Sequence, residues 1–112
     1  VKGKEKKSGI EILRKQGVIF ESDLRKIRSK DKFFNYLERE GAIVFGGFRE
    51  RVATTEEFLD DLMRTISGLT PPDAEVTLKK DAKKLRLYLF LRENGLLVFD
   101  SKKKKWQLLS AS

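Results

Sequence analysis

The sequence predicts a small α+β protein, rich in helices and with short antiparallel hairpins. Apolar residues recur at helical spacing in several segments, and glycines follow these segments where a helix must end. Short apolar runs flank turns made of glycine or lysine, as in hairpins. With 112 residues, the chain is long enough for one domain or two very small ones.

The first half of the chain is expected to fold as helix, strand, two helices and a hairpin. Ser8 is a candidate N-cap for the first helix, and Gly17 follows it as a stop signal. A basic arm precedes this helix over residues 1–7. The Gly46-Gly47 pair predicts the turn of the hairpin. The expected elements are helices over 8–16, 22–28 and 30–40 and strands over 18–20, 42–45 and 48–53.

This order of elements is the layout of a winged helix-turn-helix. The pattern Phe33-Phe34-x-x-Leu37-Glu-Arg-Glu-Gly41-x-Ile43 resembles the end of the third helix of that fold and the entry into its wing. Residues 8–54 are therefore similar to the winged-helix superfamily. The resemblance implies either DNA binding, as in transcription regulators and replication or segregation factors, or protein scaffolding, as in some tandem winged helices.

An internal repeat predicts that the second half has the same fold. The segments 37–45 and 91–99 match at an offset of 54 residues, each with Leu, Gly and Val-Phe in the same order. A second winged helix is thus expected over 55–112. Its helices would cover 55–67, 71–78 and 80–94, and its wing strands 96–99 and 106–109.

A competing interpretation makes the last third a β-meander after a single winged helix. Four leucines alternate with period two between Leu85 and Leu91, and Asn94-Gly95 is a strong hairpin dipeptide. The repeat favours the helix. As a helix this segment is apolar on nearly every side, which predicts that the other half or a second copy of the chain covers it.

Composition removes several classes of function. The chain has no cysteine and no histidine, which excludes disulfides, the usual zinc sites and acid–base catalysis by histidine. No spaced carboxylate motif suggests a metal, so neither an enzyme nor a cofactor is expected. No apolar run approaches the roughly 18 residues of a membrane span, and an intracellular location is expected. The net charge of +8 is instead typical of proteins that bind phosphates.

The candidate DNA-binding residues lie on the helix over 30–40 and at the tips of the two expected hairpins. Phe33, Phe34 and Leu37 mark the inward face of that helix, so its polar residues point outward. Asparagine can pair with adenine, arginine with guanine, and lysine with phosphate. The alternatives are an ordinary solvated helix face and, for the lysine tip, protection against aggregation. The full set is Arg28, Lys30, Lys32, Asn35, Arg39, Arg49, Arg51, Lys102, Lys103, Lys104 and Lys105.

The predicted function is weakly specific or sequence-independent binding of double-stranded DNA. Residues 1–54 carry 14 basic and 8 acidic side chains, whereas residues 55–112 carry 11 and 9, so the first half is the better DNA-binding candidate. Glu38 and Glu40 flank the outward face and dilute its charge. The alternative is therefore a protein–protein scaffold of a transcription, replication or segregation complex. Residues 85–91 would then contact a protein partner or a second copy. RNA binding has only the charge in its favour.

Overall fold

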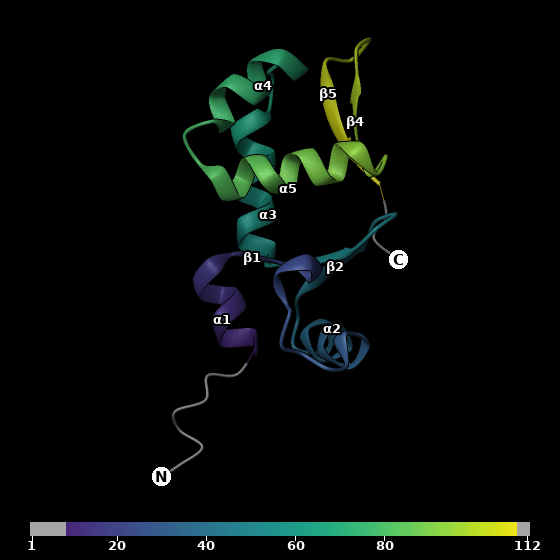
Figure 1. Cartoon of the computed structure of the whole chain (residues 1–112). Helices are drawn as coiled ribbons and strands as arrows, with labels where there is room; N and C mark the ends of the chain where they lie inside the picture. The colour runs from purple at the N-terminus through teal and green to yellow at the C-terminus, as the bar shows by residue number, and fades with distance from the viewer. Residues whose placement is uncertain (1–8, 110–112) are drawn as a thin grey trace. The chain divides into compact units, whose positions relative to one another are not determined.

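The computed structural model describes residues 9–109, so the expected arm over 1–7 and the Ser8 cap lie outside the described residues. The chain divides into two compact units between Glu56 and Glu57, two residues from the expected boundary. Each unit combines helices with a small antiparallel sheet, which confirms the α+β class (Figure 1). None of the helices within residues 9–109 has the length and apolar character needed to cross a membrane.

Unit 1 builds a three-stranded antiparallel sheet with the order β1-β3-β2. The central strand β3 pairs with β1 on one side and β2 on the other, so that Val44 and Ile19 both face Ala53 in register. Its elements are α1 (Gly9–Gln16), β1 (Val18–Phe20), the 3₁₀ helix η2 (Glu21–Asp23), α2 (Lys30–Arg39), β2 (Ile43–Gly46) and β3 (Arg51–Thr54).

The core of unit 1 lies between its two α-helices and its sheet. One cluster joins buried residues of α1, β1, α2, β3 and the turn after α2: Ile10, Leu13, Ile19, Phe34, Leu37, Ala42 and Ala53. Gly17 ends α1 with a φ of 87°, a conformation that favours glycine, and its carbonyl accepts a buried hydrogen bond from Thr54 Oγ1 at 2.7 Å. This bond ties the end of α1 to the central strand.

The helix expected over 22–28 is the main error in unit 1. Only Glu21–Asp23 is helical, as a single 3₁₀ turn, and the chain then runs irregularly to Ser29. Ser29 is the N-cap of α2 in an extended conformation, and its side chain accepts a hydrogen bond from the Lys32 amide. The start of this stretch is instead bonded to the hairpin, since Glu21 accepts from the Arg51 amide and the Ser22 amide donates to Glu50.

Unit 2 contains three helices and a two-stranded hairpin. Pro71 begins α4 at a position where its missing N–H costs nothing. The hairpin stands beside the C-terminal part of α5 (Figure 1). The elements are α3 (Glu56–Ile66), α4 (Pro71–Leu78), α5 (Ala82–Glu93), β4 (Leu97–Asp100) and β5 (Lys105–Leu108).

The β-meander alternative is wrong, because the leucine-rich segment lies within α5. Asp81 caps this helix by accepting hydrogen bonds from the amides of Lys83 and Lys84. The buried residues Leu87, Tyr88, Phe90 and Leu91 follow helical rather than alternating spacing. Asn94-Gly95 ends the helix and does not form a hairpin turn: Asn94 has a φ of −99° and its amide donates to the Phe90 carbonyl, and Gly95, with a φ of 71°, follows as the left-handed residue.

The 54-residue repeat is present in the backbone. Strand β4 begins and ends 54 residues after β2, and β5 does the same relative to β3. The helices before them end alike, at Gly41 and Gly95, both with positive φ. After each glycine, the next amide donates to the carbonyl five residues earlier, at 2.9 Å in unit 1 and 2.8 Å in unit 2. This is the Schellman arrangement, and it sets how each hairpin leaves its helix.

Trp106 is a packing residue of unit 2. Its indole N–H donates to the carbonyl of Leu69 at 3.0 Å, and its ring meets those of Tyr88 and Phe99 at centroid distances of 5.6 and 5.1 Å. The Arg92 guanidinium lies 5.4 Å from the Trp106 ring centroid. These contacts fasten β5 to α5 and to the loop between α3 and α4.

Candidate nucleic-acid interface

The outward side of α2 presents three of the candidate residues together. Lys32, Asn35 and Arg39 are all exposed, and with Glu38 they line an open surface hollow of about 540 Å³. At 3.6 residues per turn, the three positions fall within an arc of about 60°. They are called the α2 face below.

The opposite side of α2 holds the helix in place. Phe34 and Leu37 are 2% and 0% exposed and belong to the core cluster of unit 1. Because these two residues fix the rotation of the helix, the α2 face must point to solvent. It offers an amide, a guanidinium and an ammonium, which are the groups that contact base edges and phosphates in a groove.

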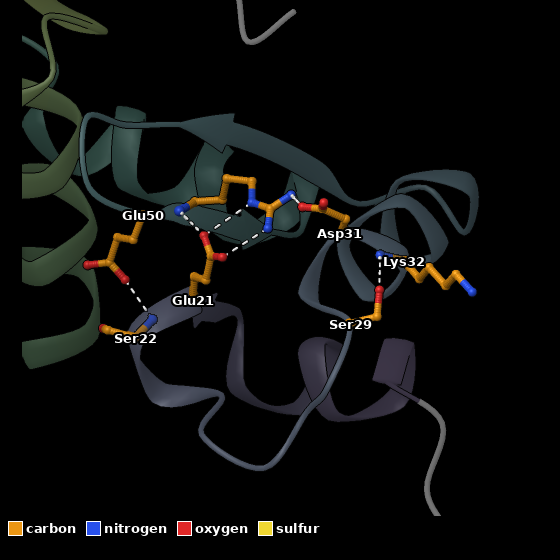
Figure 2. Close-up of polar contacts among 7 residues, drawn as sticks. Glu21, Ser22, Ser29, Asp31, Lys32 and Glu50 are labelled. Atoms are coloured by element: carbon orange, nitrogen blue, oxygen red, sulfur yellow. Dashed lines mark hydrogen bonds and ion pairs between the residues drawn. The ribbon is translucent and has the colours of Figure 1, made fainter.

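Arg51 connects three parts of unit 1 through its guanidinium (Figure 2). Its Nε and Nη2 donate to the two carboxylate oxygens of Glu21 at 3.1 and 2.9 Å, and its backbone N–H donates to Glu21 Oε1 at 2.8 Å. Nη1 pairs with Asp31 in the first turn of α2 at 2.7 Å. The guanidinium carbon lies 4.9 Å from the centroid of the Phe34 ring. These contacts are called the Arg51 clamp below.

A second carboxylate also bonds the hairpin to η2, but here the hairpin supplies the acceptor and η2 the donor. Glu50, the residue before Arg51, accepts a hydrogen bond from the Ser22 amide at 2.8 Å (Figure 2). Each of two neighbouring residues in η2 is therefore bonded to a residue at the end of the hairpin. The hairpin, whose tip comprises residues 47–50, is thus tied to η2 through Glu50 and Arg51, and Arg51 also pairs with Asp31 in the first turn of α2.

Each charge of the clamp stabilises the ionised form of its partner. Hydrogen bonds from the Arg51 side chain lower the pKa of Glu21, although partial burial acts against them, and the charge of Lys30 adds to the lowering. The same pairing with Glu21 raises the pKa of Arg51. Both groups are therefore ionised at neutral pH.

The structure separates the predicted residues of unit 1 into two groups. Arg28 and Arg49 are exposed, one in the irregular segment before α2 and the other at the hairpin tip, and both are accessible like the α2 face. Lys30 is half-buried and acts on Glu21, and the guanidinium of Arg51 is held in the clamp. We therefore assign Arg51 to holding the hairpin and leave it out of the proposed binding surface, whereas the half-buried Lys30 stays a candidate at the start of α2.

The four lysines 102–105 are exposed at the end of the β4–β5 hairpin. Asp100 shapes the turn, since its Oδ1 accepts hydrogen bonds from the amides of Lys102 and Lys103 at 3.0 and 3.2 Å. Lys104 has a φ of 55° and is the one non-glycine residue with positive φ within residues 9–109. The turn thus keeps a lysine at a position where glycine would be less strained.

Sequence reasoning missed three residues of this region. Glu21 and Asp31 hold Arg51 across about 30 and 20 positions of sequence, and no local pattern reveals such contacts. Phe48, at the hairpin tip, is 87% exposed. It was expected to begin the strand over 48–53, but β3 begins at Arg51, so Phe48 lies in the turn.

Within residues 9–109, no group of three or more acidic side chains is placed to hold a metal ion. The adjacent acidic pairs at 56–57 and 60–61 lie on exposed positions of α3, where Asp61 pairs with Lys84 of α5. No protein-family model matches the chain, and searches of curated proteins and of solved structures found no significant match.

Proposed function

We propose that the chain is a DNA-binding protein of the tandem winged-helix type, in which the α2 face of unit 1 contacts the major groove of a duplex. The observation that carries this proposal is the α2 face itself: an exposed lysine, asparagine and arginine on one side of a helix whose other side is buried. The charge of the whole chain, +8, favours a phosphate-rich partner.

The topology of unit 1 supports the same proposal. Its order of helix, strand, short helix, helix and hairpin, with the sheet order β1-β3-β2, agrees with the winged-helix layout. Arg51, at the base of the hairpin tip, pairs with Asp31 in the first turn of α2, and the tip itself carries the exposed Arg49 as a further basic group. Recognition helices of this kind contact bases mainly through their N-terminal residues. The repeated helix–hairpin of unit 2 supports the tandem form, and its exposed lysines supply phosphate contacts that do not depend on sequence.

A salt titration of duplex binding tests the proposal. Lys32→Ala together with Arg39→Ala should weaken binding and lower the slope of log K against log salt by about 2, because two phosphate contacts are lost. Arg14→Ala with Lys15→Ala on α1 is the matched control, since it removes the same charge from exposed positions elsewhere in unit 1. Equal losses in both variants would reduce the proposal to non-specific attraction, and no loss in either would reject it.

A second pair of variants separates groove reading from phosphate contact. Arg39→Lys keeps the charge but loses the planar fork that can bind guanine at two points. If Arg39 reads a base, this change should cost about 1–3 kcal/mol on the preferred site and little elsewhere. Sequence-independent binding predicts the same small change on every duplex. Circular dichroism must confirm that each variant is folded.

A protein scaffold remains the second candidate function, because unit 2 differs from unit 1 at the outward positions of its last helix. At the positions 54 residues after the α2 face, α5 carries Arg86, the exposed Leu89 and Glu93. An apolar and an acidic residue there favour a protein contact over a phosphate contact. The neighbouring Leu87 and Leu91 are buried within a single chain, so a homodimer is not required to cover them. Salt-insensitive self-association that Leu89→Lys abolishes would support the scaffold.

A further inference from the structure

The stretch over residues 24–28 lies between η2 and α2, at the place of the expected second helix, and it carries a concentrated positive charge. Three of its five residues are basic, namely Arg25, Lys26 and Arg28, and all three are exposed. Of these, only Arg28 belongs to the residues that the sequence predicts to bind DNA. The stretch is called the basic loop below.

The basic loop is held by unit 1 at both ends and through its apolar residues. Before it, the Ser22 amide is bonded to Glu50 at 2.8 Å, and after it Ser29 caps α2. Figure 2 shows the chain running between these two serines as an open loop. Leu24 packs against the core cluster of unit 1, and Ile27 is half-buried. Little freedom of the backbone is therefore left to be lost when the exposed basic side chains bind a partner.

The charges of the basic loop are not neutralised by ion pairs. Among residues 9–109, none of its three basic side chains is paired with a carboxylate. The carboxylates of Glu21 and Asp31, which flank the loop in sequence, are both directed to Arg51. Like charges this close repel each other, so the arrangement costs stability in the free protein, and a bound anion relieves that cost.

The position of the basic loop along the chain adds to this cost. It comes just before α2, whose N-terminal end carries a partial positive charge, and cations are unfavourable there. Arg14 and Lys15 provide the contrast, because they lie in the last turn of α1, where basic residues stabilise a helix. Helix stability thus accounts for the basic residues of α1 but not for those of the loop.

We propose that the basic loop binds the phosphate backbone of one DNA strand, beside the groove that the α2 face enters. The inference rests on the proposed function, which supplies the duplex. Arg28 directly precedes the cap of α2, and Lys32 lies three residues after that cap. Because a recognition helix approaches the bases with its N-terminal residues, the chain just before the helix comes close to the bordering phosphates. Arginine and lysine contact phosphates without reading sequence, and such contacts orient the protein on the duplex.

The experiment is a salt titration of binding to two duplexes of unrelated sequence, using the full chain. Arg25→Ala with Lys26→Ala, called the loop variant, should lower the slope of log K against log salt by about 2 on both duplexes. A fourfold rise in salt should then cost the parent about 10-fold more affinity than it costs the loop variant. Arg25→Lys should keep the parent slope, because a phosphate contact needs the charge but not the planar fork of arginine.

The matched control is Arg14→Ala with Lys15→Ala on α1, which removes the same charge from exposed positions and should leave the slope nearly unchanged. A polyglutamate chain is the second probe, since it offers negative charge without phosphate. The loop variant and the parent should bind polyglutamate equally weakly. All replaced side chains are exposed, so the circular dichroism of each variant should match that of the parent.

The outcomes distinguish this inference from the proposed function. A loop variant that behaves like the α1 control overturns phosphate binding by the basic loop and leaves the α2 face intact. A lower slope in the loop variant, but not in Lys32→Ala with Arg39→Ala, supports the loop and rejects the α2 face. Loop-dependent binding of polyglutamate as tight as that of the duplex overturns the inference in favour of an acidic protein surface. If the parent binds neither duplex at low salt, both proposals fail.

Discussion

Removing the Glu21 carboxylate should loosen unit 1 more than any other single change at the clamp. Glu21→Ala deletes the acceptor of three hydrogen bonds from Arg51, one from its backbone and two from its guanidinium. The Arg51 side chain is 29% exposed and that of Glu21 20%, so the pair is partly shielded from water. The remaining partner, Asp31, is 82% exposed and cannot replace what is lost.

The magnitude follows from these exposures. A hydrogen bond to a charged group contributes about 1.5–3 kcal/mol when it is well shielded, whereas exposed ion pairs contribute about 0.2–1 kcal/mol. For a half-shielded pair with three bonds, we expect Glu21→Ala to lower the free energy of unfolding of unit 1 by about 2 kcal/mol. Asp31→Asn should cost about 0.5 kcal/mol. Glu50→Ala, which removes one bond to the Ser22 amide, should fall between them at about 1 kcal/mol.

The assay is urea unfolding followed by two probes. Far-UV circular dichroism reports on both units, whereas fluorescence of the single tryptophan, Trp106, reports on unit 2. The variants should shift the dichroism transition in the order Glu21→Ala, Glu50→Ala, Asp31→Asn and leave the fluorescence transition in place. A Glu21→Ala variant that costs no more than Asp31→Asn would refute the reasoning, because the clamp would then be a surface ion pair. Equal shifts of both probes would mean that the two units unfold together.

Further expectations concern pH, turns and packing. Because the folded-state pKa of Glu21 is lowered, the stability that its carboxylate contributes is complete above the ordinary pKa of 4.5 and is lost as the pH falls through the lowered pKa. Acid unfolding followed by dichroism should show this loss. The Glu21→Gln variant should show a weaker dependence of stability on pH in that range. Lys104→Gly should stabilise unit 2 by about 1 kcal/mol in the Trp106 transition, by relieving a positive φ, and should weaken duplex binding by removing a charge. Gly41→Ala should destabilise unit 1 by more than about 1 kcal/mol in dichroism, since its φ is 103°. Trp106→Phe, which loses the bond to the Leu69 carbonyl, should lower the free energy of unfolding of unit 2 by about 1 kcal/mol, measured by dichroism.

Local signals in the sequence were sufficient for most of the helices and strands. Ser29, Gly41 and the apolar residues between them predict α2 to within one residue, since capping and periodicity act over a few positions. The repeat resolved the ambiguous segment 85–91 in favour of a helix. The helix expected over 22–28 failed because its residues are used otherwise: Glu21 and the Ser22 amide bond to the hairpin some 28–30 positions away.

The candidate site was predictable only in part, for a related reason. The outward direction of the α2 face follows from Phe34 and Leu37, which are close in sequence. The role of Arg51 depends on Glu21 and Asp31, and charge counting treats a clamped arginine and an exposed one alike. Arg49 and Arg51, two residues apart, therefore received the same prediction and have different environments.

The two hairpins have strands of the same length at the same spacing, and this bears on where the two units can differ. When two segments share a helix–hairpin fold, the residues that face the core stay alike because folding depends on them. The residues that face solvent are free to differ. Leu37 and Phe45 reappear as Leu91 and Phe99, whereas Phe48 is replaced by Lys102. Each strand of the β4–β5 hairpin begins and ends 54 residues after its counterpart in the β2–β3 hairpin. An insertion within either hairpin would break this common spacing, and the two units differ instead in the chain before the helix, where unit 1 has β1 and the described part of unit 2 has α3 and α4.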